Sequence, residues 1–329
     1  MNISDIAKLA GVSKATVSRY LNNGYVSSEK RDIIRKVIEQ NDYTPLSSAR
    51  NLRSGQNNLI GVIIPKLSSE SVARMVDGIS EIINDAGYNM VLGITDLRQE
   101  KELDFLKIFR GNTVSGMIYI ATEITRKNRE ILTAYNKPVV ILGQKSGEFD
   151  SVFHDDFGGA FAAVKHLIAQ GCDRTGFIGV TMRDKAAGRD RYDGYVKAMT
   201  DSGFSISPKC TFEGEFSMES GYAGAERLLG GSSKINGLFC ATDTIAIGAM
   251  QYCFSHGIEV GRDVKIAAVG DSKMSKAVNP ALTSVHLFYK TAGHEAAQLV
   301  MNRLNEPAGA PKSVELGFRL MERASSSNI

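Results

Sequence analysis

The spacing of apolar positions changes near residue 58. Before it, short apolar sets recur at three- and four-residue intervals, which is typical of helices. From Leu59 onward, short apolar runs alternate with stretches of helical spacing, which is typical of β-α units. The pattern predicts a small helical segment followed by an α/β body, and 329 residues are enough for more than one core.

Three short helices are expected in the first segment. Ser4 can cap a helix over residues 5–10, and Ser13 can cap a second over residues 14–21. A third begins at Ser28, and another short helix can form between Leu46 and Ser54 after a Pro break. The side chains expected to form a common small core are Ile6, Ala10, Val17, Leu21 and Ile34.

The α/β body is expected to form parallel sheets covered by helices on both faces, because apolar strands alternate with amphipathic helices. The expected strands are 59–65, 89–94, 116–120, 138–142, 176–180, 237–240 and 265–269. The first expected helix of this body ends near residue 86, and the others are 100–109, 160–169, 190–200, 217–229, 244–255 and 289–304. The length favours two lobes with a cleft between them, and the final six residues, 324–329, are expected to be disordered.

This pattern divides the chain into three parts. They are a helix-turn-helix segment over 1–45, a short helix and linker over 46–58, and a two-lobed core over 59–329. The expected fold class is therefore an all-α helix-turn-helix headpiece followed by an α/β core of two lobes with parallel sheets.

Charge is unevenly distributed along the chain. Residues 1–55 hold nine Lys or Arg against five acids, a net charge of +4, whereas the remainder holds 30 basic and 31 acidic residues. A basic end is where a polyanion would bind, although many solvated helices are equally basic. The charge alone therefore only permits nucleic-acid binding.

Other kinds of chemistry find little support. The four cysteines are far apart, so neither a disulfide framework nor a zinc site is expected, and a reducing cytoplasmic compartment fits. The five histidines have no metal-ligand spacing, and no catalytic or phosphate-loop motif occurs. No apolar signal core or membrane-spanning run is present. We expect a non-enzymatic protein with no cofactor and no membrane association.

The second predicted helix has the properties of a DNA-recognition helix. Its outward face is small and polar with two cations, and we expect DNA contacts from Ser13, Lys14, Ala15, Thr16, Ser18, Arg19 and Asn22. A small face can enter a major groove, Arg19 can pair bidentately with guanine, and the methyl of Ala15 or Thr16 can meet a thymine methyl. The alternative is an ordinary surface helical hairpin.

The first twenty-two residues resemble the lactose/galactose (LacI/GalR) repressor family. The stretches Asp5-Ile-Ala-Lys-Leu-Ala-Gly-Val-Ser and Ala15-Thr-Val-Ser-Arg-Tyr-Leu-Asn carry the resemblance, which extends more loosely over the whole chain. In that family the residues two and three places beyond the turn Val select the operator, which implies Lys14 and Ala15 here. The conserved recognition Arg falls at Arg19.

The segment Tyr43-Thr-Pro-Leu-Ser-Ser-Ala-Arg-Asn-Leu-Arg-Ser-Gly resembles the family's hinge. The resemblance implies a helix that forms on DNA and wedges Leu52, beside Ala49 and Arg53, into a minor-groove step. The bend then brings both half-sites into contact with the protein. The family usually has Asn after the hinge Pro, where this chain has Leu46.

The α/β body resembles the periplasmic sugar-binding fold, which closes around a ligand at the carboxyl ends of its strands. Polar residues near those ends are the expected effector contacts, namely Lys66, Gln144, Arg191, Asp243 and Asp271. Arg191-Tyr-Asp-Gly matches the family's effector-binding Arg-x-x-Gly, although Arg191 could instead pair with a neighbouring Asp. Asp243 matches Asp-x-x-Ala-x-Gly, but it could equally cap the following helix.

The class of effector stays open between a sugar and a sugar phosphate. Where the family commonly has two acids after Gly-aromatic, this chain has Gly270 and Asp271, which puts a sugar-hydroxyl contact from the first acid in doubt. This variant and the Asp155-Asp156 pair are most similar to the trehalose-repressor branch. A cation after the first strand, here Lys66, could hold a phosphate.

The resemblance implies a cytoplasmic regulator that acts as the repressor of a carbohydrate-utilisation operon. A homodimer would place two recognition helices on a pseudo-palindromic operator in double-stranded DNA, and a small effector in the cleft would change operator affinity. The main alternative is a transport-type sugar-binding protein. Such a protein would have a signal peptide and no basic headpiece. An enzyme with a DNA anchor would need a clustered catalytic set.

Overall fold

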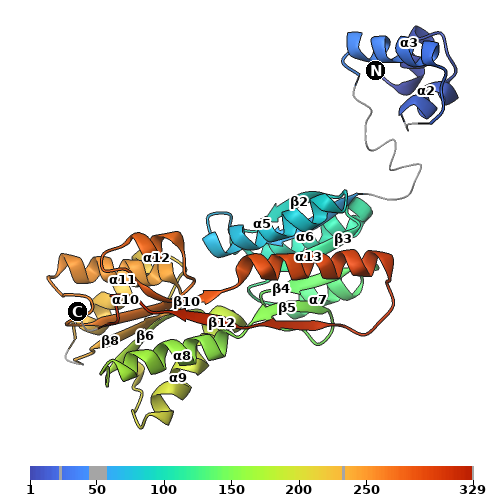
Figure 1. Ribbon diagram of the computed structural model, residues 1–329. Helices are drawn as coiled ribbons and strands as arrows, with labels where there is room; N and C mark the ends of the chain where they lie inside the picture. The colour runs from blue at the N-terminus through green and yellow to red at the C-terminus, as the bar shows by residue number, and fades with distance from the viewer. Residues whose placement is uncertain (22–23, 44–57, 232–233, 328–329) are drawn as a thin grey trace. The chain divides into compact units, whose positions relative to one another are not determined.

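The computed structural model divides into two compact units, Met1–Asn58 and Leu59–Ile329 (Figure 1). The residues that it describes are 1–21, 24–43, 58–231 and 234–327. The predicted short helix at 46–54 lies outside the described residues, and so do the predicted DNA contacts Asn22, Ala49, Leu52 and Arg53.

The first unit contains α1 (Ile3–Leu9), α2 (Lys14–Leu21) and α3 (Ser28–Gln40). The predicted cap at Ser4 is wrong, because Asn2 caps α1 in a reciprocal capping box with Asp5. Ser13 does accept a hydrogen bond from the backbone N–H of Thr16, as a cap of α2 should. The buried core is Ile6, Ala7, Ala10, Val17, Val26 and Ile34.

The first lobe of the second unit is built on a six-stranded parallel sheet of order β11-β5-β4-β3-β1-β2. Its strands are β1 (Leu59–Ile64), β2 (Asn89–Ile94), β3 (Gly116–Ile120), β4 (Val139–Leu142), β5 (Asp150–His154) and β11 (Ser313–Leu316). Its helices are α5 (Glu70–Asp85), α6 (Gln99–Ile108) with the π-turn η1 (Phe109–Thr113), α7 (Arg126–Thr133) and α13 (Tyr289–Asn305). Val62 packs in the cluster that contains Ile79 of α5, and Ile63 in the cluster that contains Leu106 of α6. Both faces of the sheet are therefore buried, as its apolar strands predict.

The second lobe has a sheet of order β12-β10-β9-β8-β6-β7, which is parallel except for β12 against β10. Its strands are β6 (Thr175–Val180), β7 (Thr211–Gly214), β8 (Gly237–Cys240), β9 (Lys265–Val269), β10 (Thr283–Leu287) and β12 (Phe318–Met321). Its helices are α8 (Asp156–Ala169), η2 (Lys185–Asp190), α9 (Arg191–Asp201), η3 (Pro208–Cys210), α10 (Met218–Leu229), α11 (Asp243–Ser255) and α12 (Lys273–Ala277).

The chain crosses between the lobes three times, from β5 to α8, from β10 to α13 and from β11 to β12. The crossings touch one another. The backbone N–H of Asp155 donates to the Leu316 carbonyl at 2.9 Å, and the His154 ring meets the Tyr289 ring edge-on at a centroid distance of 5.1 Å. None of β5, β10, β11 and β12 was expected from the sequence, because these strands are short and carry polar residues such as Asp150, Ser284 and Glu315.

The helix pairs beside the cleft pack at glycines. A Cβ on Gly248 of α11 would overlap the Met218 carbonyl of α10, and one on Gly194 of α9 would overlap the Phe157 carbonyl of α8. A Cβ on Gly293 of α13 would likewise overlap the Met75 carbonyl of α5. Each glycine lets two backbones approach more closely than any side chain permits.

The predicted disorder at residues 324–329 is wrong for the described part of that segment. Ser325 and Ser326 are completely buried. The Ser325 hydroxyl donates to the Ile266 carbonyl and accepts from the Thr283 backbone N–H, and the Ser326 hydroxyl bonds with the Thr283 hydroxyl and with His166 Nε2. A serine-rich terminus has the composition of a disordered segment. Here, however, the serine hydroxyls form hydrogen bonds with backbone groups of neighbouring strands.

We expect Gly248→Ala to lower the free energy of unfolding of the full-length protein by about 1–3 kcal/mol, because the added methyl forces α10 and α11 apart. Calorimetric unfolding measures the effect. Gly147→Ala is the matched control, since a Cβ at Gly147 meets open space. Equal stability of both variants would contradict the close-packing argument.

Candidate functional site

The recognition face predicted on α2 is accessible in the structure. Lys14, Ala15 and Arg19 are exposed, whereas Val17 on the opposite face is completely buried in the small core. The Arg19 side chain lies along its own helix, with Nε 3.4 Å from the Ala15 carbonyl. This face is small and carries two cations, which suits a major groove.

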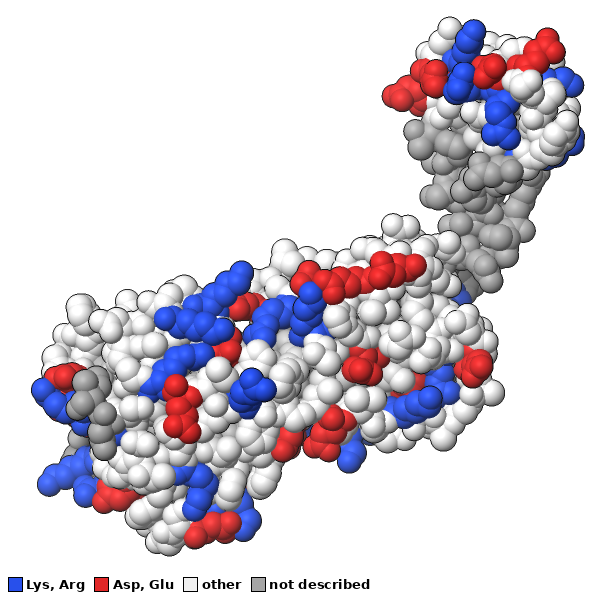
Figure 2. All heavy atoms as spheres, in the orientation of Figure 1, with Lys and Arg blue, Asp and Glu red and all other residues white. Residues whose placement is uncertain are grey.

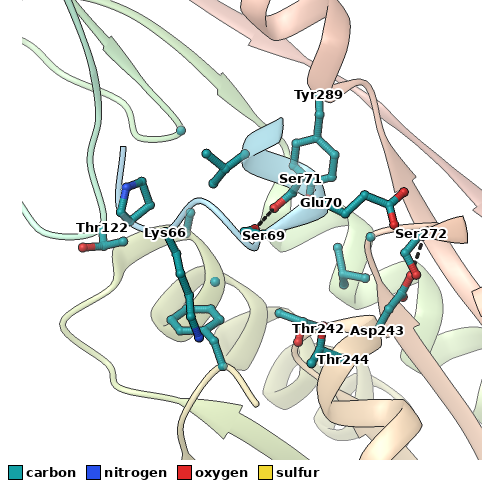
Figure 3. A pocket seen from close by; sticks show the side chains of 18 of the residues that line it. Lys66, Ser69, Glu70, Ser71, Thr122, Thr242, Asp243, Thr244, Ser272 and Tyr289 are labelled. Atoms are coloured by element: carbon teal, nitrogen blue, oxygen red, sulfur yellow. Dashed lines mark hydrogen bonds between the residues drawn. The ribbon is translucent and has the colours of Figure 1, made fainter. Parts of the chain in front are cut away.

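The core has a pocket of about 540 Å³ lined by residues of both lobes (Figure 3). Figure 3 shows Lys66, Ser69, Glu70, Ser71 and Thr122 of the first lobe on one side and Thr242, Asp243, Thr244 and Ser272 of the second lobe on the other. The pocket lies at the carboxyl ends of the strands, where open α/β sheets bind ligands.

Helix N-termini converge on this pocket and hold carboxylates there. Glu70, Asp156, Glu219 and Asp243 each lie in the first turn of a helix, namely α5, α8, α10 and α11, and all four line the pocket. A helix N-terminus stabilises a nearby negative charge, so the fold itself favours acids at these positions. Figure 2 shows that elsewhere, on the face of the core in view, acidic and basic side chains are interspersed.

Arg191 lines the pocket and is buried in an ion pair with Asp156. Its Nε and Nη2 lie 2.8 and 2.7 Å from Asp156 Oδ1, and Nη1 donates to the Ala241 carbonyl. Burial disfavours the charged guanidinium, but Asp156, Tyr289 and Asp184 together outweigh this effect and raise the pKa of Arg191. The predicted alternative of a surface pair with a neighbouring Asp is wrong, since the partner is thirty-five residues away on α8.

Asp243 lines the pocket but does not cap α11, because Thr242 does. Its Oδ2 accepts from the Ser272 backbone N–H at 2.7 Å, and its Oδ1 accepts from the Ser284 hydroxyl at 2.5 Å. Gly270 stands where the family commonly has an acid. A Cβ there would lie 3.1 Å from Asp243 Oδ2, which is a tight contact.

Two of the predicted effector residues are not among those that line the pocket. The Gln144 amide donates to the carbonyls of Ala121 and Thr122 within its own lobe. The Asp271 carboxylate is buried against Arg323 and His286, with His286 Nδ1 at 2.9 Å from Oδ2. Both residues follow strands as predicted, but their side chains support neighbouring loops.

Comparison with known proteins gives a family match for each of the two units. Residues 2–46 match the model of bacterial regulatory proteins of the lacI family, and residues 164–326 match a periplasmic binding protein-like domain. The chain is 32% identical over 305 residues to the sucrose operon repressor of Staphylococcus xylosus, covering 93% of each protein. It is 31% identical to catabolite control protein A of Priestia megaterium, covering 99% of each. The lac repressor dimer bound to operator has the same fold, with a TM-score of 0.88 at 23% identity and 99% coverage of each chain.

The chain belongs to the LacI family of bacterial regulatory proteins. It is a DNA-binding transcription regulator, and its fold class is the one expected from the sequence. The regulators that it resembles match along nearly their whole length, so they favour neither an enzyme nor a transport-type binding protein. None of the helices in the described ranges is long and apolar enough to cross a membrane.

Sequence reasoning missed several pocket residues of this LacI-family regulator, among them His154, Asp156 and Tyr289. His154 and Tyr289 stand at two of the lobe crossings, and Asp156 directly follows one of them. A signal for Asp156 existed, because it follows Asp155 at the start of an apolar helix, where first-turn acids concentrate. For His154 no signal existed, since a single histidine in a short strand is usually part of a core.

We expect Arg191→Met to cost about 3–5 kcal/mol of folding stability, because it leaves the buried Asp156 charge without its partner. Replacing both residues, as Arg191→Met with Asp156→Asn, should recover a large part of that loss. Urea unfolding of the full-length regulator measures both effects. The exposed pair Arg126–Glu130 is the control, where Arg126→Met should cost less than about 1 kcal/mol. A double variant no more stable than the single one would show that the pair is not coupled.

Proposed function

We propose that this regulator is a cytoplasmic homodimeric repressor of a carbohydrate-utilisation operon, released from or held on its operator by a neutral, hydroxyl-rich effector in the core pocket. The observation that carries the proposal is the charge of the pocket lining. Five carboxyl groups line it, those of Glu70, Asp156, Asp184, Glu219 and Asp243. Sugar hydroxyls donate hydrogen bonds that such carboxylates accept.

The cations of the pocket argue against a phosphorylated effector. Three cationic side chains are among the described residues that line the pocket. Arg191 pairs with Asp156, and Arg74 donates to the Gly270 carbonyl. Lys66 is close enough to Glu219 to contribute to the lowered pKa of that carboxyl, after the hydrogen bonds from its own backbone and from Ser217. Among the described lining residues, a phosphate would therefore compete with a carboxylate for Arg191 and for Lys66, and with the Gly270 carbonyl for Arg74. These neighbours disfavour the alternative in which Lys66 holds a phosphate.

His154 supplies a specific acceptor in the pocket. Its side chain is buried, and its Nε2 has no hydrogen-bond partner, whereas the ring bonds with the backbone of Phe288. Burial lowers the pKa of His154 and outweighs Asp156 and the Phe288 backbone, which raise it, so the neutral ring is favoured. With Nδ1–H donating to Phe288, Nε2 is left as an acceptor. A buried unpaired acceptor costs free energy that an effector hydroxyl or N–H would recover.

A thermal-shift screen of the full-length regulator tests the effector class. Sucrose, cellobiose, trehalose and ribose are compared with glucose 6-phosphate and trehalose 6-phosphate, since a ligand at 100 times its Kd stabilises by about 2.7 kcal/mol. We expect a neutral sugar to raise Tm and the phosphates to have no effect. His154→Phe should weaken binding of that sugar while leaving the Tm of the protein alone near that of the wild type. Stabilisation by a phosphate only would favour the Lys66 interpretation and contradict this proposal.

The DNA-binding half of the proposal rests on α2, and selection of binding sites from a randomised DNA library tests it. We expect the wild type to enrich a pseudo-palindrome, as a two-fold dimer requires. Arg19→Ala should lose discrimination of about 1–3 kcal/mol at one base pair in each half-site. Arg35→Ala, on α3 and paired with Asp32, is the control and should retain the wild-type motif. An unchanged motif in Arg19→Ala would exclude Arg19 from base recognition.

A further inference from the structure

We propose that Glu70 and Arg74, one turn apart on α5, form a latch that holds the two lobes of the core together at the rim of the pocket. Both residues belong to the first lobe, and both bind the loop of residues 270–273, which follows β9 in the second lobe. The regulatory meaning of the latch rests on the proposed effector pocket. The contact between the lobes can be tested without any ligand.

Glu70 binds the start of a helix in the other lobe. Both of its carboxylate oxygens lie 3.1 Å from the backbone N–H of Lys273, the first residue of α12. In Figure 3 the Glu70 side chain extends away from α5 toward Ser272. The first N–H groups of a helix have no partner within the helix, so a carboxylate is a strong acceptor for them.

Arg74 makes the second contact across the lobes. Its Nη1 lies 3.2 Å from the Gly270 carbonyl, and its guanidinium stands 5.3 Å from the centroid of the Tyr289 ring. Tyr289 begins α13, which packs on α5 in the first lobe. The ring therefore holds Arg74 in place on its own lobe while the guanidinium reaches the other.

The loop that the latch binds is fixed within the second lobe. Asp271 has a φ of +48°, and its carboxylate is buried against Arg323 and His286. The backbone N–H groups of Asp271 and Ser272 donate to Ser284 and Asp243. Asp271 thus positions the loop, and the Gly270 carbonyl and the Lys273 N–H remain directed at α5. Because Glu70 also lines the pocket, the latch lies where a bound molecule can reach it.

The distance between the lobes tests the proposal. Nitroxide labels at Arg126→Cys on α7 and Arg262→Cys in the second lobe, both at exposed positions, report it by pulsed electron paramagnetic resonance of the full chain. Cys210→Ser removes the partly exposed native thiol, and the other three cysteines are buried. Excess unlabelled protein limits the measured distances to those within one chain.

We expect one narrow distance distribution for the otherwise unaltered protein, and a broader one at longer distance for Glu70→Gln combined with Arg74→Ala. Glu81→Gln is the matched control, because Glu81 lies on the same helix but binds Lys290 and His294 of its own lobe. Glu70→Gln alone should give an intermediate distribution, which keeps the test decisive if the double variant does not fold. Identical distributions in all folded variants would overturn the latch, as would a broad distribution with Glu70 and Arg74 intact.

Discussion

The convergence of helix N-termini on one pocket is the constraint on which the core depends. Parallel strands place the start of each following helix at the carboxyl edge of the sheet, and two lobes bring two such edges together. First-turn acids are stabilised there, so four carboxylates meet in one place. Arg191 is the buried countercharge that makes this tolerable, and its pairing with Asp156 leaves a pocket that is rich in acceptors.

The family motifs of the core have a packing explanation. In Arg191-Tyr-Asp-Gly194, the glycine lets α9 approach the Phe157 carbonyl of α8, and one turn earlier this approach places Arg191 against Asp156 at the start of α8. In the motif that begins at Asp243, Gly248 plays the same part between α11 and α10. The charged residue and the glycine therefore act together. The glycine sets the distance between the helices, and that distance brings the charge to the pocket.

The sequence predicts the repeating β-α units well, because apolar strands and helices of helical spacing are local patterns. It does not predict the crossings, since β5 and β10 are short, partly polar strands. Each also pairs with a strand that is distant in the chain, β5 with β11 and β10 with β12. Position after a strand correctly indicates that Lys66, Arg191 and Asp243 lie at the pocket, yet it also selects Gln144 and Asp271, whose side chains turn elsewhere. Side-chain direction depends on three-dimensional neighbours such as Arg323, which no local pattern contains.

The energetics of switching favour an effector that bridges the lobes. Moving an equilibrium between two lobe arrangements from 1:99 to 99:1 requires about 5.5 kcal/mol of differential binding free energy. One hydrogen bond to a charged group contributes roughly 1.5–3 kcal/mol, so two to four such bonds must exist in one arrangement and not in the other. Glu70 lies on the first lobe and Asp243 on the second, and both line the pocket. A molecule with several hydroxyls can bond both at once, and only lobes at the correct separation permit it.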